Sequence, residues 1–227
     1  ALRANGLEDN TLVVYTSDHG EQVGEHGLWW KQTFYEDSVR VPAILKWPGR
    51  LSPNVRSDRV CSGLDLNATM LDALGCPPLP QSRGRSLLPL LQSPKTSPWE
   101  DIAFSEFCLD GAGAGGPTGE HGIVQRMVRR GDWKLNYYDT QPSQLFHLAE
   151  DPRELNDRIA DPHCATIRNE LLALVLDGWD PALVRQEMAR HRADLPILRG
   201  WAKHVQPADT CRWNLRPEMD YLDTGGQ

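Results

Sequence analysis

A cluster of ligand-type and charged side chains follows a short apolar segment near the start of the chain. Its members lie within a single loop: Asp18, His19, Glu21, Glu25, His26 and Lys31. A carboxylate and an imidazole side by side, as in Asp18 and His19, can both bind one divalent cation. The alternative is that Asp18 starts a turn and that His19 bonds to a backbone group. From the residues alone both interpretations stay open.

Two apolar segments must position this loop. Residues 11–16 are rich in β-branched side chains and do not alternate with polar ones, which is typical of a strand covered on both faces, as in a parallel sheet. Residues 39–47 predict a second strand, with Pro42 at its start or at a sheet edge. An α/β enzyme places its chemistry just beyond the carboxyl end of such a strand.

Further elements follow along the chain. A helix is expected in the segment LNATMLDALG (66–75), with Asp65 before it as N-cap and Gly75 as the residue just past the last helical one. Turn residues separate four short strand-like runs that predict an antiparallel sheet, at 102–108, 123–128, 133–138 and 144–148. Two helices are expected near the end, one over residues 165–176 and one that begins at Pro181 and is interrupted by Pro196.

Composition excludes several classes of function. The net charge is −7, and no run of Lys or Arg exceeds two residues, so nucleic-acid binding is not expected. No apolar stretch approaches 18 residues, so no membrane segment is expected. The five cysteines are scattered without a CxxC pair, which favours reduced thiols over a disulfide framework or a structural zinc site.

The loop and its flanks resemble a known family. The strings SDHG (17–20) and GEHG (24–27) precede Lys31, and VRVP (39–42) follows it without gaps. This order is similar to the second metal-binding segment of the sulfatase family, which belongs to the alkaline phosphatase superfamily. Further segments resemble that family's signatures, at 65–69 (DLNAT), 84–91 (GRSLLPLL), 128–135 (VRRGDWKL) and 144–156 (QLFHLAEDPRELN). His147 stands where the family usually has Asp.

The resemblance implies particular roles. Asp18 and His19 would bind a divalent metal, calcium by preference and manganese as the alternative. Lys31 would contact the sulfate group or the leaving oxygen. His26 lies close to this presumed site in the sequence and is a second candidate catalytic residue that contacts the substrate, with an exposed loop histidine as the alternative. The family's nucleophile is a formylglycine made from Cys or Ser in C/S-x-P-x-R. No such string occurs here, since the nearest one, CPPLP (76–80), has Pro in place of the Arg.

The resemblance therefore implies the C-terminal portion of a choline-sulfatase-like or arylsulfatase-like protein. The expected fold class is α/β, the C-terminal part of an alkaline-phosphatase-like α/β sandwich domain followed by a small antiparallel-sheet-plus-helix subdomain. We expect the catalytic-domain part at residues 1–95, the small β subdomain at 96–160 and a helical C-terminal extension and tail at 161–227. The formylglycine would lie in a missing N-terminal part.

Three functions are compatible with this sequence. The first is a sulfuric ester hydrolase that acts on a small-molecule sulfate ester and of which this chain supplies part of the active site. The second is a phosphodiesterase or phosphonate monoester hydrolase of the same superfamily. The third is a truncated chain without catalysis of its own. We further expect homo-oligomer contacts through the C-terminal extension and a cytoplasmic location, with a periplasmic or secreted one as the alternative.

Overall fold

The computed structural model describes residues 1–93, 97–109 and 122–205. The chain divides into two compact units, Ala1–Ala182 and Leu183–Gln227. His121, in the glycine-rich stretch, and Cys211 lie outside the described residues. All residues of interest for chemistry belong to the first unit.

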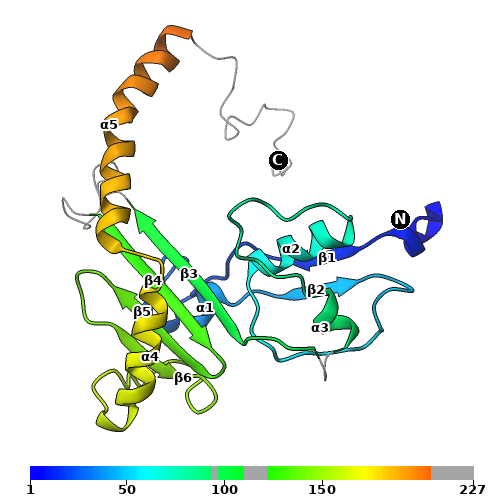
Figure 1. Cartoon of the computed structure of the whole chain (residues 1–227), viewed down its shortest axis with the longest axis horizontal. Helices are drawn as coiled ribbons and strands as arrows, with labels where there is room; N and C mark the ends of the chain where they lie inside the picture. The colour runs from blue at the N-terminus through cyan, green and yellow to red at the C-terminus, as the bar shows by residue number, and fades with distance from the viewer. Residues whose placement is uncertain (94–96, 110–121, 206–227) are drawn as a thin grey trace, which may run out of the picture. The chain divides into compact units, whose positions relative to one another are not determined.

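The N-terminal part of the first unit contains a two-stranded ribbon and short helices (Figure 1). Its elements in chain order are η1 (Arg3–Asn5), η2 (Glu8–Asn10), β1 (Val13–Thr16), η3 (Glu25–Gly27), α1 (Glu36–Val39), β2 (Ala43–Lys46), α2 (Gly63–Ala73) and α3 (Leu88–Gln92). The second strand is shorter than the predicted 39–47, because Val39 ends α1 and the strand begins only after Pro42, which has no N–H to donate.

The ribbon differs from the predicted parallel arrangement. Strand β1 pairs antiparallel with β2, with Tyr15 opposite Ile44. These two side chains share one face of the ribbon and are 63% and 59% exposed, so that face of β1 is not covered, whereas Val14 and Leu45 on the other face are partly buried. The prediction was wrong for this chain because burial of an apolar strand depends on neighbours, and β2 is its one partner among the described residues.

Helix α2 begins one turn earlier than expected. Ser62 is the N-cap, and Asp65 occupies the N3 position of a capping box, in which its Oδ2 accepts the Ser62 backbone N–H at 2.8 Å. Gly75 has φ of +67° and follows the C-cap residue, as predicted. Leu66 of this helix packs with Leu87 and Leu90 in a small apolar cluster.

The C-terminal part of the first unit is built on a four-stranded sheet. Its strands are β3 (Ile102–Leu109), β4 (Ile123–Arg130), β5 (Trp133–Tyr138) and β6 (Gln144–His147). The order is β3-β4-β5-β6 with every pair antiparallel, which confirms the predicted sheet. The tight turn between β4 and β5 uses Gly131 at φ +58°.

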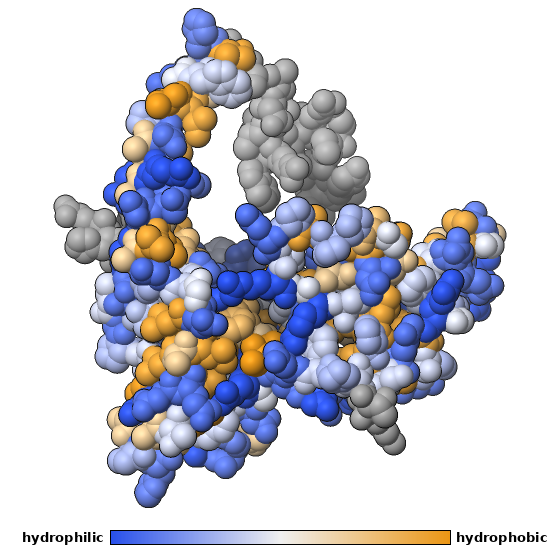
Figure 2. Space-filling view, in the orientation of Figure 1, coloured by the Kyte–Doolittle hydropathy of each residue, from blue (hydrophilic) through white to orange (hydrophobic). Residues whose placement is uncertain are grey.

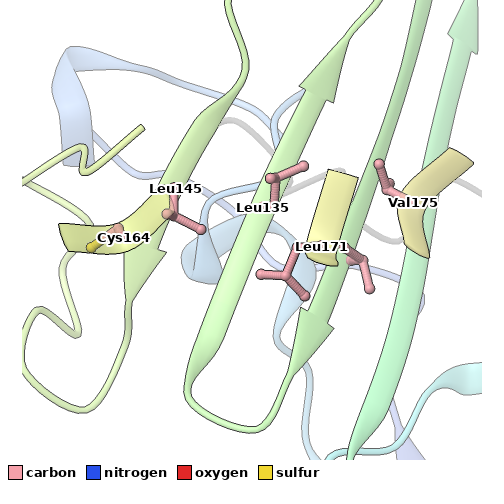
Figure 3. Close-up of a cluster of buried hydrophobic side chains, with 6 residues drawn as sticks. Leu135, Leu145, Cys164, Leu171 and Val175 are labelled. Atoms are coloured by element: carbon pink, nitrogen blue, oxygen red, sulfur yellow. The ribbon is translucent and has the colours of Figure 1, made fainter. Parts of the chain in front are cut away.

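Helix α4 (Ala165–Leu176) covers one face of this sheet, after the single turn η5 (Pro162–Cys164). Leu135 and Leu145 point from neighbouring strands toward Leu171 and Val175 of the helix (Figure 3), Val128 of β4 belongs to the same cluster, and all five are fully buried. Each such side chain contributes about 1.5–3 kcal/mol by leaving water. Because side chains alternate along a strand, residues 129 and 134 point to the opposite face.

Helix α5 (Pro181–Val205) accounts for the described residues of the second unit. Asp180 caps it, since its Oδ1 accepts the Ala182 N–H at 2.8 Å. The predicted interruption at Pro196 is wrong, because the helix continues through this residue. A proline removes one backbone hydrogen bond, and the turns on either side keep theirs. Within the described ranges, no helix is long and apolar enough to cross a membrane.

Candidate active site

Asp18, His19 and Lys31 converge on one cavity of the first unit. Lys31 Nζ lies 2.5 Å from His19 Nε2, and Asp18 Oδ2 lies 3.4 Å from the same nitrogen. All three residues line a cavity of about 430 Å³, which β3 and β4 close on another side with Ser105 and Met127. The structure thus brings together three of the four residues predicted for the site.

The orientation of His19 suits a metal ligand. Its Nδ1 lies 2.7 Å from the carbonyl oxygen of Gly20, and a carbonyl only accepts, so Nδ1 carries the hydrogen. The lone pair of Nε2 is therefore directed to the cavity, toward Lys31 and Asp18. A hydrogen bond at the second ring nitrogen that fixes tautomer and direction is the usual support of a metal-bound histidine.

Asp18 is suited to hold a cation. Desolvation raises the pKa of this carboxyl, but backbone N–H hydrogen bonds and the neighbouring His19 and Lys31 together lower it below its ordinary value. One of these hydrogen bonds is the His19 N–H to Asp18 Oδ1, at 3.1 Å. The carboxylate is therefore ionised near neutral pH.

Gly20 fixes the turn that carries both residues. Its N–H donates to the Ser38 carbonyl at 2.8 Å. A Cβ added at Gly20 would lie 1.9 Å from the carbonyl oxygen of Asp37, so no larger residue fits between the turn and α1. The close approach of two backbones, not an unusual φ angle, makes glycine necessary here.

Hydrogen bonds across the loop fix the position of Lys31. Glu21 Oε1 accepts the Trp30 N–H at 2.5 Å, next to the lysine. The Gln22 side chain is buried, and its Nε2 donates to Thr33 Oγ1 and Ser38 Oγ, each at 2.8 Å. Sequence reasoning missed Gln22, because a glutamine within a polar loop has no pattern that marks it as buried.

A buried ionic cluster attaches α1 to the four-stranded sheet. Lys134 Nζ is fully buried and lies 3.0 Å from Glu36 Oε1 and 2.8 Å from Glu154 Oε1. The Glu36 N–H donates to Glu154 Oε2 at 2.6 Å, and Arg129 Nη1 donates to Glu36 Oε2 at 2.9 Å. Burial raises the pKa of Glu154, and the Lys134 charge opposes this shift. The cluster holds the loop against the strands that complete the cavity.

His26, the fourth predicted site residue, lies elsewhere. Its ring stacks on Tyr35, with centroids 3.8 Å apart and planes 9° from parallel. It does not line the cavity that contains Lys31. The structure therefore gives His26 a packing contact in the loop, and the catalytic role stays a prediction.

Among the described residues, only Asp18 and His19 are candidate metal ligands at this site. No group of three or more His, Cys, Asp or Glu side chains suited to a metal ion occurs in the described part of the chain. Calcium takes six to eight oxygen ligands, while imidazole suits zinc, copper or iron better. The Asp18 and His19 pair fits part of a divalent metal site, and other ligands must come from beyond these residues.

A protein-family model described as N-sulphoglucosamine sulphohydrolase, C-terminal, matches residues 24–177. The chain belongs to the sulfatase family. This sulfatase chain is 32% identical to the choline-sulfatase of Rhizobium meliloti over 212 residues, which are 88% of the chain and 38% of that protein. It is 37% identical to arylsulfatase K of Mus musculus over 170 residues, 69% of the chain and 28% of that protein.

Solved structures agree with this assignment. One is a protein in complex with its substrate D-glucosamine-2-N,6-O-disulfate, with a TM-score of 0.67 and 27% identity over 82% of the sulfatase chain and 37% of the other. Another is the phosphonate monoester hydrolase of Agrobacterium radiobacter, with a TM-score of 0.69 and 28% identity over the same shares. The sulfatase chain thus spans less than half the length of these relatives and has their alkaline-phosphatase-like fold in that part.

Proposed function

We propose that the protein carrying this chain hydrolyses sulfate esters and that residues 17–31 supply one side of its active site. The observation that supports this most is the meeting of Asp18, His19 and Lys31 at one cavity, in a chain of the sulfatase family. The names of two relatives, choline-sulfatase and arylsulfatase K, support a small sulfate ester as the substrate in this proposal.

Each residue has a role that follows from its chemistry. Asp18 and His19 Nε2 hold a divalent cation, calcium in our proposal. Such a cation, when bound, withdraws charge from the oxygens of the transferring group. The Lys31 ammonium is 2.5 Å from His19 Nε2, close enough for both to serve the same ligand. Lys31 donates hydrogen bonds to the sulfate or to the leaving oxygen as its negative charge develops.

The nucleophile is a formylglycine that lies outside residues 1–227, because no C/S-x-P-x-R string occurs in this sequence. Residues 1–227 alone then lack the nucleophile and do not turn over sulfate esters. Purified residues 1–227 should release no sulfate from an aryl sulfate that the intact protein hydrolyses. Catalytic turnover by the isolated chain would refute this proposal.

A comparison of two ester types tests the reaction class. The intact protein should give a larger kcat/KM for an aryl sulfate than for an aryl phosphonate monoester of the same leaving group. The opposite order would assign it to phosphonate ester hydrolysis, the activity in the name of one structural relative. Measuring both esters under the same metal supply keeps the comparison free of differences in metal content.

A metal assay tests the ligand assignment without any turnover. We expect the Asp18→Ala variant of the intact protein to bind less calcium than wild type in equilibrium dialysis, because a carboxylate ligand is lost. Asp9→Ala is the matched control, since this residue lies outside the cavity. Equal calcium binding by wild type and Asp18→Ala would contradict the assignment.

A further inference from the structure

A larger cavity adjoins the candidate active site along the edge strand β3. Its volume is about 950 Å³, and it shares Ser62 and the β3 residues 103–106 with the smaller cavity. Arg126 and Trp179 line only the larger cavity, and Lys31 lines only the smaller one. The larger cavity is thus a separate space next to the proposed reaction centre.

Arg126 is a buried cation in the wall of the larger cavity. It is 7% exposed, and its guanidinium carbon lies 4.8 Å from the Phe104 ring centroid and 5.4 Å from that of Trp179. Its Nη1 donates to the Val175 carbonyl at 2.9 Å. This hydrogen bond pairs one N–H group of Arg126 with a carbonyl at the C-terminal end of α4. Its Nε is buried and has no hydrogen-bond partner.

A second buried donor lies in the same wall. Trp179 Nε1 is also buried and without a hydrogen-bond partner. A buried donor without an acceptor is unfavourable, and two neighbouring donors need the same kind of partner. A group with several acceptor oxygens would satisfy both at once.

The lining of this cavity carries three arginines, Arg83, Arg85 and Arg126, and three carboxylates, Asp65, Glu100 and Glu106. Arg83 lines the cavity beside Gly178 and forms no hydrogen bond or ion pair with the described residues. Arg85 differs, because its Nη2 donates to the Glu100 carbonyl at 3.1 Å and its guanidinium stacks on Trp99. Burial lowers the pKa of Arg126, the carboxylates of Glu106 and Asp177 raise it, and Arg83 lowers it, yet no carboxylate of the described residues pairs with Arg126.

We propose that the larger cavity binds an oxyanion, a sulfate or carboxylate group held by Arg83, Arg126 Nε and Trp179 Nε1. Guanidinium groups bind planar and tetrahedral oxyanions through charge-assisted hydrogen bonds, which a partly desolvated wall strengthens. The anion has one of two sources. It is either the free ion in solution or a second acidic group on the substrate whose ester lies in the neighbouring cavity.

Binding of inorganic sulfate tests this site independently of turnover. In nuclear magnetic resonance spectra of the intact protein with isotope-labelled tryptophan, sulfate should shift the Trp179 indole N–H signal saturably, and Trp179→Phe assigns that signal. The shift should persist in Lys31→Ala, which removes the cation of the smaller cavity. Arg83→Gln should weaken sulfate binding about tenfold or more, because a charge-assisted hydrogen bond is lost.

Two controls make the result decisive. Arg50→Gln alters an arginine that stacks on Trp47 away from the cavity and should leave the sulfate affinity unchanged. Chloride at the same ionic strength should not shift the Trp179 signal. No saturable shift with sulfate, or an equal affinity in Arg83→Gln and wild type, would overturn the proposal.

Steady-state kinetics then separates the two sources of the oxyanion. If it belongs to the substrate, Arg83→Gln raises KM for an aryl sulfate that carries a carboxylate and leaves KM unchanged for the same ester without it. If it is the free ion, both KM values stay at the wild-type level while sulfate binding at Trp179 is weakened. These outcomes concern affinity, so they are distinct from a failure of the sulfatase proposal, which would appear as an absence of sulfate release.

Discussion

At the scale of single residues, the site depends on a few short contacts that direct side chains into one cavity. The Gly20 carbonyl fixes the His19 ring, and the contact of Glu21 with the Trp30 backbone places the following lysine. Asp18 and Lys31 approach His19 Nε2 from two sides. The loop therefore presents a carboxylate, an imidazole lone pair and an ammonium to the same small volume.

Gly20→Ala should disrupt this arrangement. The added methyl would meet the Asp37 carbonyl at 1.9 Å, so the turn must move away from α1. We expect a loss of about 1–3 kcal/mol in the free energy of unfolding and reduced activity of the intact protein. Gly63→Ala is the control, because a Cβ there meets nothing within 4 Å in a helix and should be neutral or stabilising. Equal unfolding midpoints in denaturant for Gly20→Ala and wild type would contradict this account.

At the scale of elements, the ionic cluster around Lys134 links α1 to the sheet. Glu36 starts α1, Lys134 lies on β5, and Glu154 follows β6. The segments that resemble sulfatase signatures around 134 and 154 thus form a structural contact that keeps α1, and the loop of residues 17–31 before it, in place. Their distance from Asp18 along the chain gives no hint of this, since the contact exists only after the sheet has formed.

Lys134→Met should be strongly destabilising. The substitution keeps the length of the side chain but leaves the buried Glu154 carboxylate without its cation, whereas Glu36 keeps its ion pair with Arg129. Removing one partner of a buried ion pair costs about 3–5 kcal/mol. Chemical denaturation of the intact protein measures the loss. Arg190→Ala breaks an exposed ion pair with Glu187 on α5 and should leave the denaturation midpoint unchanged. Similar midpoints for both variants would show that the cluster is not what joins these elements.

Much of the fold follows from local sequence patterns. The four strands of the antiparallel sheet and helix α4 occur where turn residues and apolar spacing predict them. The errors concern what local patterns cannot encode: the partner of β1, the cap of α2 at Ser62 and the continuity of α5 at Pro196. In the site, Asp18, His19 and Lys31 meet as expected, whereas the buried Gln22 and Lys134 depend on distant contacts.

Helix α5 allows a test of the proline that it contains. Pro196→Ala restores a backbone donor in the helix interior and should increase the helical signal in circular dichroism and the amide protection of α5. Pro181→Ala is the matched control, because a proline at the first helical position lacks only an N–H that would be unpaired anyway. A decrease of amide protection in Pro196→Ala would mean that the proline stabilises α5.

At the scale of the whole molecule, the ribbon leaves apolar surface uncovered. Tyr15 and Ile44 are cross-strand neighbours that remain largely exposed, and Trp30 is 73% exposed in the loop beside them. Figure 2 shows hydrophobic residues at the surface over the part of the chain that contains β1, β2 and α2. The chain spans less than half the length of the relatives that it matches.

Residues 1–227 expressed alone should therefore aggregate or bind a hydrophobic dye. An unpaired strand edge with apolar side chains favours association with other chains. Replacing Tyr15 and Ile44 together by Lys should reduce dye binding and aggregation of the isolated chain, as measured by fluorescence and light scattering. A sharp cooperative melt of a monomeric wild-type chain would contradict this prediction.

The most direct test of the proposed function is the activity of two single variants of the intact protein on an aryl sulfate. Lys31→Ala and Asp18→Ala should each lower kcat/KM by about a hundredfold or more, because each removes charge stabilisation of the transferring group. Lys46→Ala, an exposed lysine of β2 outside the cavity, should retain wild-type activity. Unchanged kcat/KM in both Lys31→Ala and Asp18→Ala would contradict the assignment of this loop to the active site.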